Sequence, residues 1–189
     1  MNSGKNGKSG KIGAENEKKT RSLMMFIKEW IVPIVVAFIF AFIVNRYVIF
    51  KIEVPTGSMI PTINVDDRIF VRRVYNKDKF EKGDILVFNS NQEDILLVKR
   101  LIGLPGDKVS LINGDLYIND VLVEETYVVN NMDYTDEYLV PEDHFLFFGD
   151  NRASSIDARY WDKPFIHKDE VIGKAGLRVS PLKNIGFIK

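Results

Sequence analysis

The longest apolar stretch of the chain lies near its N-terminus, at residues 30–50 (WIVPIVVAFIFAFIVNRYVIF). Its strongly polar residues are Asn45 and Arg46, and residues 30–44 carry no charge. With the residues from 23 onward the stretch is long enough to cross a bilayer, and Pro33 stands near the start, where a membrane span tolerates it. We therefore predict a transmembrane helix over residues 23–50. The alternatives are a buried helix of a soluble core and a cleaved signal peptide, which the missing small-x-small cleavage site disfavours.

The rest of the chain alternates short apolar runs with turn signals, which predicts a mainly β domain. Asn113-Gly114 between two apolar runs is a strong hairpin signal, and Asn119-Asp120 marks a second turn. The polar residues 124–143 are expected to form a loop. Short strands at this spacing favour an antiparallel sheet arranged as a sandwich or a barrel. The predicted strands are residues 68–74, 85–88, 95–102, 109–112, 116–118, 121–123, 144–148 and 171–179.

Charge divides the chain into two parts. Residues 1–29 carry seven Lys/Arg and three acidic residues, whereas the 189-residue chain as a whole is neutral. The positive-inside rule places the N-terminus in the cytoplasm and the residues after the span outside, with the lipid bilayer as a partner of the span. We expect a disordered, basic cytoplasmic tail over residues 1–22, the span over 23–50 and an extracytoplasmic β-rich domain over 51–189. The mildly acidic body disfavours nucleic acid as a partner.

The composition excludes several kinds of site. The chain has no cysteine, which excludes disulfide scaffolds, thiol proteases, zinc fingers and iron–sulfur clusters. Its two histidines, His144 and His167, are too few for a metal site built on several imidazoles. We expect no metal and no organic cofactor.

Residues 54–62 (VPTGSMIPT) place two prolines, one glycine and three hydroxyl groups directly after the predicted span. Such a rigid, non-repetitive backbone can hold a hydroxyl nucleophile next to backbone N–H groups. Ser58 is the candidate nucleophile. On composition alone, a proline-stiffened linker from the membrane to the domain is the favoured interpretation.

A second candidate is the pair Lys99-Arg100 inside the apolar run of residues 95–102 (ILLVKRLI). Strand alternation points the two side chains to opposite faces, so one of the charges is expected to face the core. A lysine surrounded by apolar groups loses affinity for its proton and can act as a base near neutral pH. The alternative is an edge strand whose cations extend to water.

Residues 148–161 are dense in polar groups that brace loops, and Asp157 and Arg159 could form an ion pair there. Taken alone, this segment is more typical of a solvated polar turn. A serine nucleophile needs a proton acceptor, and neither histidine accompanies a serine motif. Because Ser-Lys dyads are a known variant of the serine triad, Ser58 with Lys99 is the better pair.

Three motifs, taken in order after one N-terminal span, resemble bacterial type I signal peptidase. They are G-S-M-x-P-T at residues 57–62, V-K-R-x-I-G-x-P-G-D at residues 98–107 and G-D-N-R-x-x-S-x-D-x-R at residues 149–159. The similarity covers residues 30–179. Members often carry Asp-Asn in place of Ala153-Ser154, and Ser in place of Ala158. These departures leave open the geometry of that loop.

The resemblance implies a membrane-bound serine endopeptidase that removes signal peptides from exported precursors, cutting after small-x-small sites. By this resemblance Ser58 is the nucleophile and Lys99 the general base, and the Ser58 N–H and the Thr56 hydroxyl form the oxyanion hole. The serine that orients the lysine falls on Ser155, with the adjacent Ser154 as the alternative. The residues that brace the site fall on Asp150, Asp157 and Arg159.

Two other functions remain as alternatives. One is a different Ser-Lys protease of the self-cleaving repressor type, against which the N-terminal span argues. The other is a non-catalytic, membrane-tethered β domain that binds exported proteins, against which Ser58 and Lys99 together argue.

Overall fold

The computed structural model describes residues 19, 21–22, 24–91 and 94–188. The expected tail over residues 1–22 lies outside these residues except at Lys19, Arg21 and Ser22. The chain forms two compact units, residues 1–47 and 48–189, and each is described by itself.

The first unit is a helix long and apolar enough to cross a membrane, Met24–Tyr47, with a mean hydropathy of 2.3. Its 24 residues span about 36 Å at 1.5 Å per residue, which exceeds the hydrocarbon core of a bilayer at about 30 Å. A π-helical turn, η1 (Ile27–Ile31), precedes the α-helix α2 (Val32–Tyr47). The wider turn is adjacent to Pro33, whose ring has no N–H and crowds the preceding turn.

The helix ends before the expected boundary at residue 50. Residues Ile49–Glu53 form strand β1, which pairs with β2 (Arg68–Arg73) in an antiparallel register of Ile49 opposite Arg72. Ile49 and Phe50 extend the apolar stretch in sequence, but their backbone groups bond to a neighbouring strand. The predicted span is therefore three residues too long at its C-terminal end.

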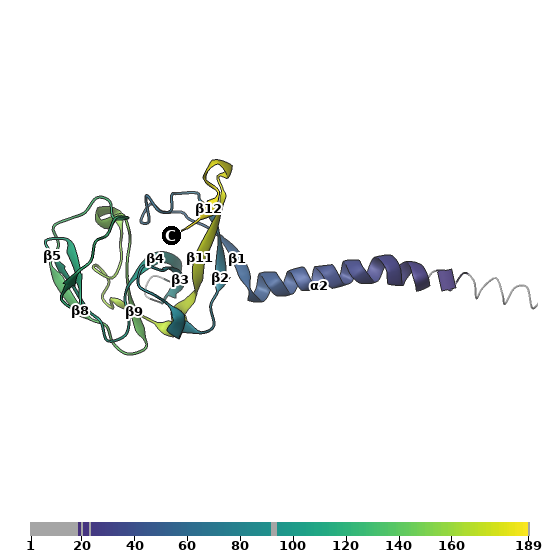
Figure 1. Cartoon of the computed structure of the whole chain (residues 1–189), viewed down its shortest axis with the longest axis horizontal. Helices are drawn as coiled ribbons and strands as arrows, with labels where there is room; N and C mark the ends of the chain where they lie inside the picture. Colours follow the sequence, from purple (N-terminus) through teal and green to yellow (C-terminus); the bar gives the residue numbers. More distant parts are fainter. Residues whose placement is uncertain (1–18, 20, 23, 92–93, 189) are drawn as a thin grey trace, which may run out of the picture. The chain divides into compact units, whose positions relative to one another are not determined.

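The second unit is built from two antiparallel sheets (Figure 1). The larger sheet has the order β1-β2-β11-β3-β4-β9-β10, and β12 also pairs with β11. Its remaining strands are β3 (Ile85–Ser90), β4 (Ile95–Gly103), β9 (His144–Phe148), β10 (Phe165–His167), β11 (Val171–Ser180) and β12 (Gly186–Phe187). The expected mainly β fold of antiparallel sheets with one N-terminal apolar helix is confirmed.

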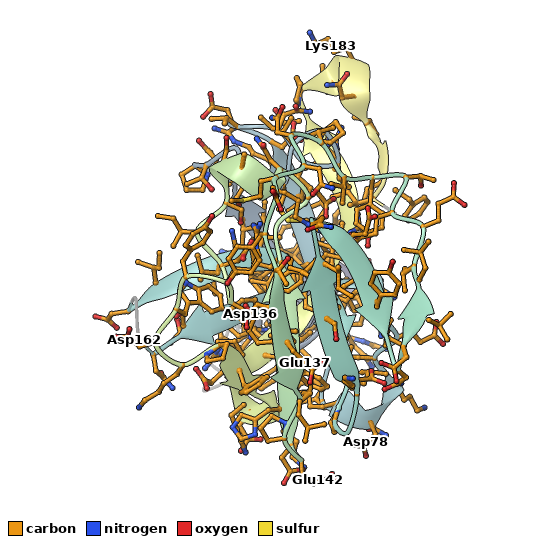
Figure 2. The ribbon with its side chains drawn as sticks, turned by 90° about the vertical axis from the view of Figure 1, so that its left-hand side faces the viewer. Asp78, Asp136, Glu137, Glu142, Asp162 and Lys183 are labelled. Carbon is orange, nitrogen blue, oxygen red and sulfur yellow. The ribbon has the colours of Figure 1, made fainter. Side chains whose placement is uncertain are left out.

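The smaller sheet has the order β7-β6-β5-β8, and Figure 2 shows Asp136 and Glu137 of β8 on it. Its strands are β5 (Lys108–Ile112), β6 (Asp115–Ile118), β7 (Val121–Leu122) and β8 (Asp136–Leu139). Both predicted turns lie where expected: Asn113-Gly114 joins β5 to β6, and Asn119-Asp120 joins β6 to β7, with all four residues at positive φ. The expected loop over residues 124–143 is wrong at β8, which pairs with β5.

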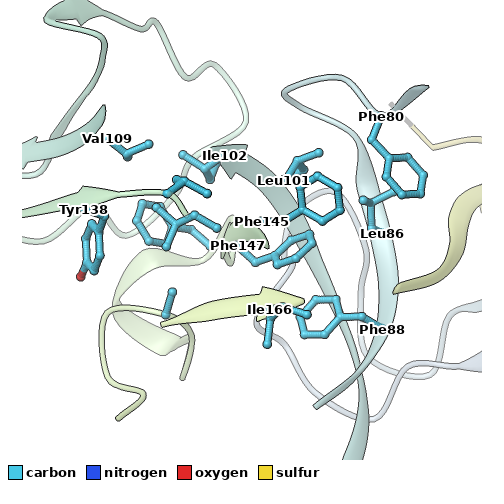
Figure 3. Close-up of a cluster of buried hydrophobic side chains, with 14 of the residues drawn as sticks. Phe80, Leu86, Phe88, Leu101, Ile102, Val109, Tyr138, Phe145, Phe147 and Ile166 are labelled. Atoms are coloured by element: carbon cyan, nitrogen blue, oxygen red, sulfur yellow. The ribbon is translucent and has the colours of Figure 1, made fainter. Parts of the chain in front are cut away.

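Two apolar cores lie on opposite faces of β3. Leu86 and Phe88 face a large aromatic core (Figure 3), whereas Ile85 and Val87 face a smaller one. This double burial explains why the strand is apolar without alternation. The smaller core also takes side chains from the segment after β1, so β3 connects that segment to the rest of the domain.

Short 3₁₀ helices complete the domain, and one of them follows the G-D-N motif. They are η2 (Lys77–Lys79), η3 (Arg152–Ser154), η4 (Lys168–Glu170) and η5 (Leu182–Asn184).

Candidate active site

The turn that carries Ser58 is held by side chains on both sides of the serine. Met59 and Ile63 are buried in the smaller core at 1% and 0% exposure, and the Ile63 N–H donates to the Met59 carbonyl at 2.8 Å. At its start the Val54 N–H donates to the Asp67 carbonyl at 3.0 Å. The segment is thus a packed turn of the domain, and Ser58 is buried at 8% exposure.

Lys99 and Arg100 of β4 point to opposite faces of the larger sheet, as alternation predicts. Lys99 lies opposite Leu86, which faces the large core, and Arg100 lies opposite Ile85, which faces the smaller one. Both residues are 3% exposed. We expected one of the two charges to face a core, and both do. The alternative, an edge strand whose cations extend to water, is wrong.

The Lys99 ammonium group is both buried and hydrogen-bonded. Its Nζ donates to Ser155 Oγ at 2.9 Å, and Ser155 is itself 3% exposed. Burial lowers the pKa of Lys99 from 10.5 to about 8, although the Asp157 carboxylate raises it in part. At pH 7 about one molecule in ten then carries a neutral lysine able to accept a proton.

Ser58, Lys99 and Thr56 line one cavity of about 200 Å³, together with Ser154 and Trp161. The Thr56 hydroxyl lies 3.5 Å from Ser58 Oγ. The candidate nucleophile, the candidate base and the candidate oxyanion donor therefore face a common space. Ser154 reaches this space too, but the hydrogen bond from Lys99 goes to Ser155.

The loop of residues 149–155 joins the Ser58 turn to the lysine. The Asn151 N–H donates to the Ser58 carbonyl at 3.0 Å, and the Asn151 side chain donates to the Gly57 carbonyl at 3.1 Å. Gly149 admits no side chain, because a Cβ there would stand 2.2 Å from Ser155 Oγ and 2.6 Å from the Ser58 carbonyl oxygen. Ser155 and the Ser58 carbonyl therefore both pack against the backbone of Gly149.

Two buried ion pairs brace this loop. The Asp150 carboxylate accepts from Arg100 Nε and Nη2, both at 2.8 Å, and from the Thr62 hydroxyl at 2.5 Å. The Asp157 carboxylate accepts from Arg159 Nε and Nη2 at 2.8 Å, and from the Gly149 N–H at 2.8 Å. Bidentate pairs of this kind fix geometry as well as charge.

Sequence reasoning assigned no role to Arg100, Gly149, Asn151 or Thr62, although all four lie in the three motifs. The signal that could have found them was their position inside the three motifs. The two histidines lie elsewhere, because His144 and His167 pair across β9 and β10 with ring centroids 5.1 Å apart. In the part of the chain that the structure describes, no group of three or more His, Cys, Asp or Glu side chains could hold a metal ion.

Comparison with known proteins gives a consistent match. Residues 27–180 match the family model described as signal peptidase, peptidase S26. A probable signal peptidase I-2 of Synechocystis sp. is 34% identical over 165 residues, 82% of this chain and 73% of that protein. The signal peptidase IB of Staphylococcus aureus is 34% identical over 175 residues, 82% of this chain and 90% of that protein.

Among solved structures, a signal peptidase I from Enterococcus faecalis is 34% identical and covers 51% of this chain and 96% of its own, with a TM-score of 0.44. The family model covers most of the chain, and the two relatives each align with more than four fifths of it. The chain belongs to the signal peptidase family, peptidase S26.

Proposed function

We propose that Ser58 is the nucleophile and Lys99 the general base with which this membrane-bound serine endopeptidase removes signal peptides from exported precursors. One observation carries the assignment: a lysine at 3% exposure faces the same cavity as a serine, with a neutral hydroxyl as its hydrogen-bond partner. A lysine in that setting is a proton acceptor near neutral pH, which a serine nucleophile requires.

The reaction proceeds in two halves. Neutral Lys99 takes the proton of Ser58 Oγ, and the oxygen forms a bond to the scissile carbonyl carbon. The C–N bond then breaks, Lys99 returns the proton to the leaving amine, and the mature protein departs. Lys99 next takes a proton from water, whose oxygen attacks the ester carbonyl carbon. The ester C–O bond then breaks, Lys99 returns the proton to Ser58 Oγ, and the signal peptide leaves as a carboxylate. Ser155 holds the lysine in position during both halves.

The negative charge that develops on the carbonyl oxygen meets two donors, the Ser58 N–H and the Thr56 hydroxyl. Thr56 Oγ1 stands 3.5 Å from Ser58 Oγ, which puts its hydroxyl beside the carbon under attack. One such donor contributes a factor of about 10²–10³ to the rate.

The substrate would bind as an added strand. Strand β9 pairs with β4 from Arg100 onward, and no ladder partner is described for residues 95–99 on that side of β4. An extended peptide there forms backbone hydrogen bonds that do not depend on its sequence. Alternate side chains then point the same way. This suits the spacing of a small-x-small site.

Two small cavities flank Ser58 for those side chains. One, of about 200 Å³, reaches Ile156 and Trp161, and the other, of about 180 Å³, reaches Ile52 and Leu96. Ser58 lines both cavities. Small apolar side chains one and three residues before the cut fit such spaces, which supports the expected specificity.

The membrane topology is part of the proposal. The excess of Lys/Arg over acidic residues before the helix Met24–Tyr47 supports a cytoplasmic N-terminus and a domain of residues 48–189 on the opposite side. Exported precursors with an Ala-x-Ala site would reach the catalytic domain on that side.

The test uses full-length protein in detergent with a precursor that carries an Ala-x-Ala site. Mass spectrometry reads the new N-terminus for wild type, Ser58→Ala and Lys99→Ala. Cleavage after the second Ala by wild type alone supports the nucleophile and the base together. Cleavage by all three proteins would remove both residues from these roles. A folded wild type that is inactive in detergent and also in lipid would favour a non-catalytic, tethered domain.

A further inference from the structure

Three guanidinium groups are buried in or beside the 149–155 loop, and the two ion pairs already described neutralise only two of them. Arg100 pairs with Asp150 and Arg159 pairs with Asp157. Arg152 is the third, and its side chain is 1% exposed. A buried guanidinium cannot lose its proton, so it needs a carboxylate partner to offset its loss of water.

The partner of Arg152 comes from outside the three motifs. The Glu125 carboxylate, whose side chain is 8% exposed, accepts a hydrogen bond from Arg152 Nη2. The same oxygen accepts from the Tyr127 hydroxyl at 2.7 Å. Burial raises the pKa of Tyr127, so its hydroxyl remains a donor to Glu125.

The segment around Glu125 is attached to the 149–155 loop along its backbone. The Val129 N–H donates to the Asp150 carbonyl at 3.0 Å, and the Arg152 N–H donates to the Val129 carbonyl at 3.1 Å. The Ala153 N–H donates to the Asn130 carbonyl at 3.0 Å. Residues 125–130 have no regular secondary structure, as expected of a loop, and they form a strap fastened along the 149–155 loop by these backbone hydrogen bonds.

A second side chain of this strap, that of Tyr127, contacts the guanidinium group of Arg100. The Tyr127 ring covers Arg100, whose Cζ lies 3.8 Å from the ring centroid. Arg100 in turn holds Asp150. Glu125 thus contacts Arg152 within the loop, and Tyr127 contacts Arg100, which holds Asp150 of the same loop.

Two further contacts connect Arg152 to the reacting groups, the first to Gly149 and the second from Gly149 to Ser155 and Ser58. Arg152 Nε donates to the Gly149 carbonyl at 3.2 Å. Gly149 is in close contact with Ser155 and with the Ser58 carbonyl, and Ser155 receives the Lys99 hydrogen bond. A shift of Arg152 therefore displaces the hydroxyl that aims the base and the turn that carries the nucleophile.

We propose that Glu125 is a positioning residue for the Ser58–Lys99 dyad, acting through Arg152 and the 149–155 loop. The inference rests on the proposed function of that dyad. Glu125 touches no reacting atom and lines neither cavity beside Ser58. Its loss is therefore expected to lower kcat and to leave KM unchanged.

The chain offers a matched control one residue away. Glu124 is exposed, whereas Glu125 is not, so Glu124→Gln and Glu125→Gln make the same chemical change in different settings. Full-length variants in detergent are assayed for kcat and KM on the Ala-x-Ala precursor. We expect Glu125→Gln to lower kcat by about 10- to 100-fold with KM within about twofold, and Glu124→Gln to match wild type.

A double-mutant cycle separates positioning from general damage. If Glu125 acts by aiming Lys99 through Ser155, then Glu125→Gln costs little further activity in a Ser155→Ala background. Equal losses in both backgrounds would overturn the inference, as would a kcat for Glu125→Gln within about twofold of Glu124→Gln, or a loss that falls on KM. Thermal melts check that each variant is folded at the assay temperature.

A milder variant decides the question if Glu125→Gln does not fold. Tyr127→Phe removes the hydroxyl donor to Glu125 and keeps the ring on Arg100. A kcat loss of a few-fold that vanishes in the Ser155→Ala background supports the inference, and an unchanged kcat overturns it. A folded wild type without activity would overturn the proposed function, whereas an active wild type with an unaffected Glu125 variant overturns only the positioning role.

Discussion

The burial of Lys99 makes the pH dependence of cleavage a direct test of the proposed mechanism. Only the neutral lysine can take the Ser58 proton, and its pKa is lowered to about 8 by burial. Below that value kcat/KM should fall tenfold for each pH unit, and above it kcat/KM should level off.

The size of the effect follows from the same shift. An ordinary lysine with a pKa of 10.5 would be neutral in about one molecule in 3,000 at pH 7, whereas Lys99 is neutral in about one in ten. Burial therefore raises the population of active base about 300-fold at pH 7, which corresponds to about 3 kcal/mol. Lowering the pH from 7 to 6 should reduce kcat/KM about tenfold.

The assay measures kcat/KM between pH 5.5 and 10 on a peptide with a blocked N-terminus and no histidine, so that the substrate does not titrate in this range. The double variant His144→Gln/His167→Gln is the control, because both rings lie across β9 and β10, outside the cavity. It should keep the wild-type midpoint. A flat profile, a midpoint near 10.5, or a midpoint that moves with the histidines would refute the assignment of Lys99 as a desolvated base.

Three further substitutions have outcomes that the structure specifies. Thr56→Ala should lower kcat by about 10²–10³ while the melting temperature is retained, and a loss below about threefold would remove Thr56 from the oxyanion hole. Gly149→Ala should nearly abolish cleavage in single-turnover assays, because the added methyl meets Ser155 Oγ at 2.2 Å. Lys99→Met should raise the free energy of unfolding at pH 7 by up to about 3 kcal/mol, measured by urea titration. The gain has this sign because the folded-state pKa of Lys99 lies below its unfolded value, so the unfolded chain binds more protons until pH rises through 10.5, where the gain should disappear.

Local signals in the sequence predicted the turns well, and non-local pairing limited the rest. Asn113-Gly114 and Asn119-Asp120 determine their own backbone conformation, and both appear as predicted. Strand β8 was missed because its sequence, DEYL, buries only Tyr138 and so lacks a visible alternation. The helix boundary was misplaced because Ile49 and Phe50 are as apolar as the span, and only their pairing with β2 makes them a strand.

For the site, strand alternation separated Lys99 from Arg100, but it did not indicate that both are buried. Arg100 is buried because Asp150 lies 50 residues away in sequence and meets it in space, which no local pattern reveals. The role proposed for Glu125 was even harder to predict from the sequence, since its segment is polar and belongs to none of the three motifs. Sequence reasoning therefore named the residues that face the cavity and, through the family resemblance, the bracing residues Asp150, Asp157 and Arg159. It missed Arg100 and Glu125, whose partners come from distant parts of the chain.

The supporting ion pairs explain why Lys99 has a lowered pKa although carboxylates lie near it. Both oxygens of Asp150 accept from Arg100, and both oxygens of Asp157 accept from Arg159. These carboxylates already have cations of their own, so what Lys99 bonds to is the neutral hydroxyl of Ser155. Because a hydroxyl stabilises an ammonium group less than a carboxylate would, the cost of burial prevails and the proton is held weakly. By pairing with the nearby carboxylates, the two arginines thus favour the neutral form of Lys99, which is the form that the proposed mechanism requires.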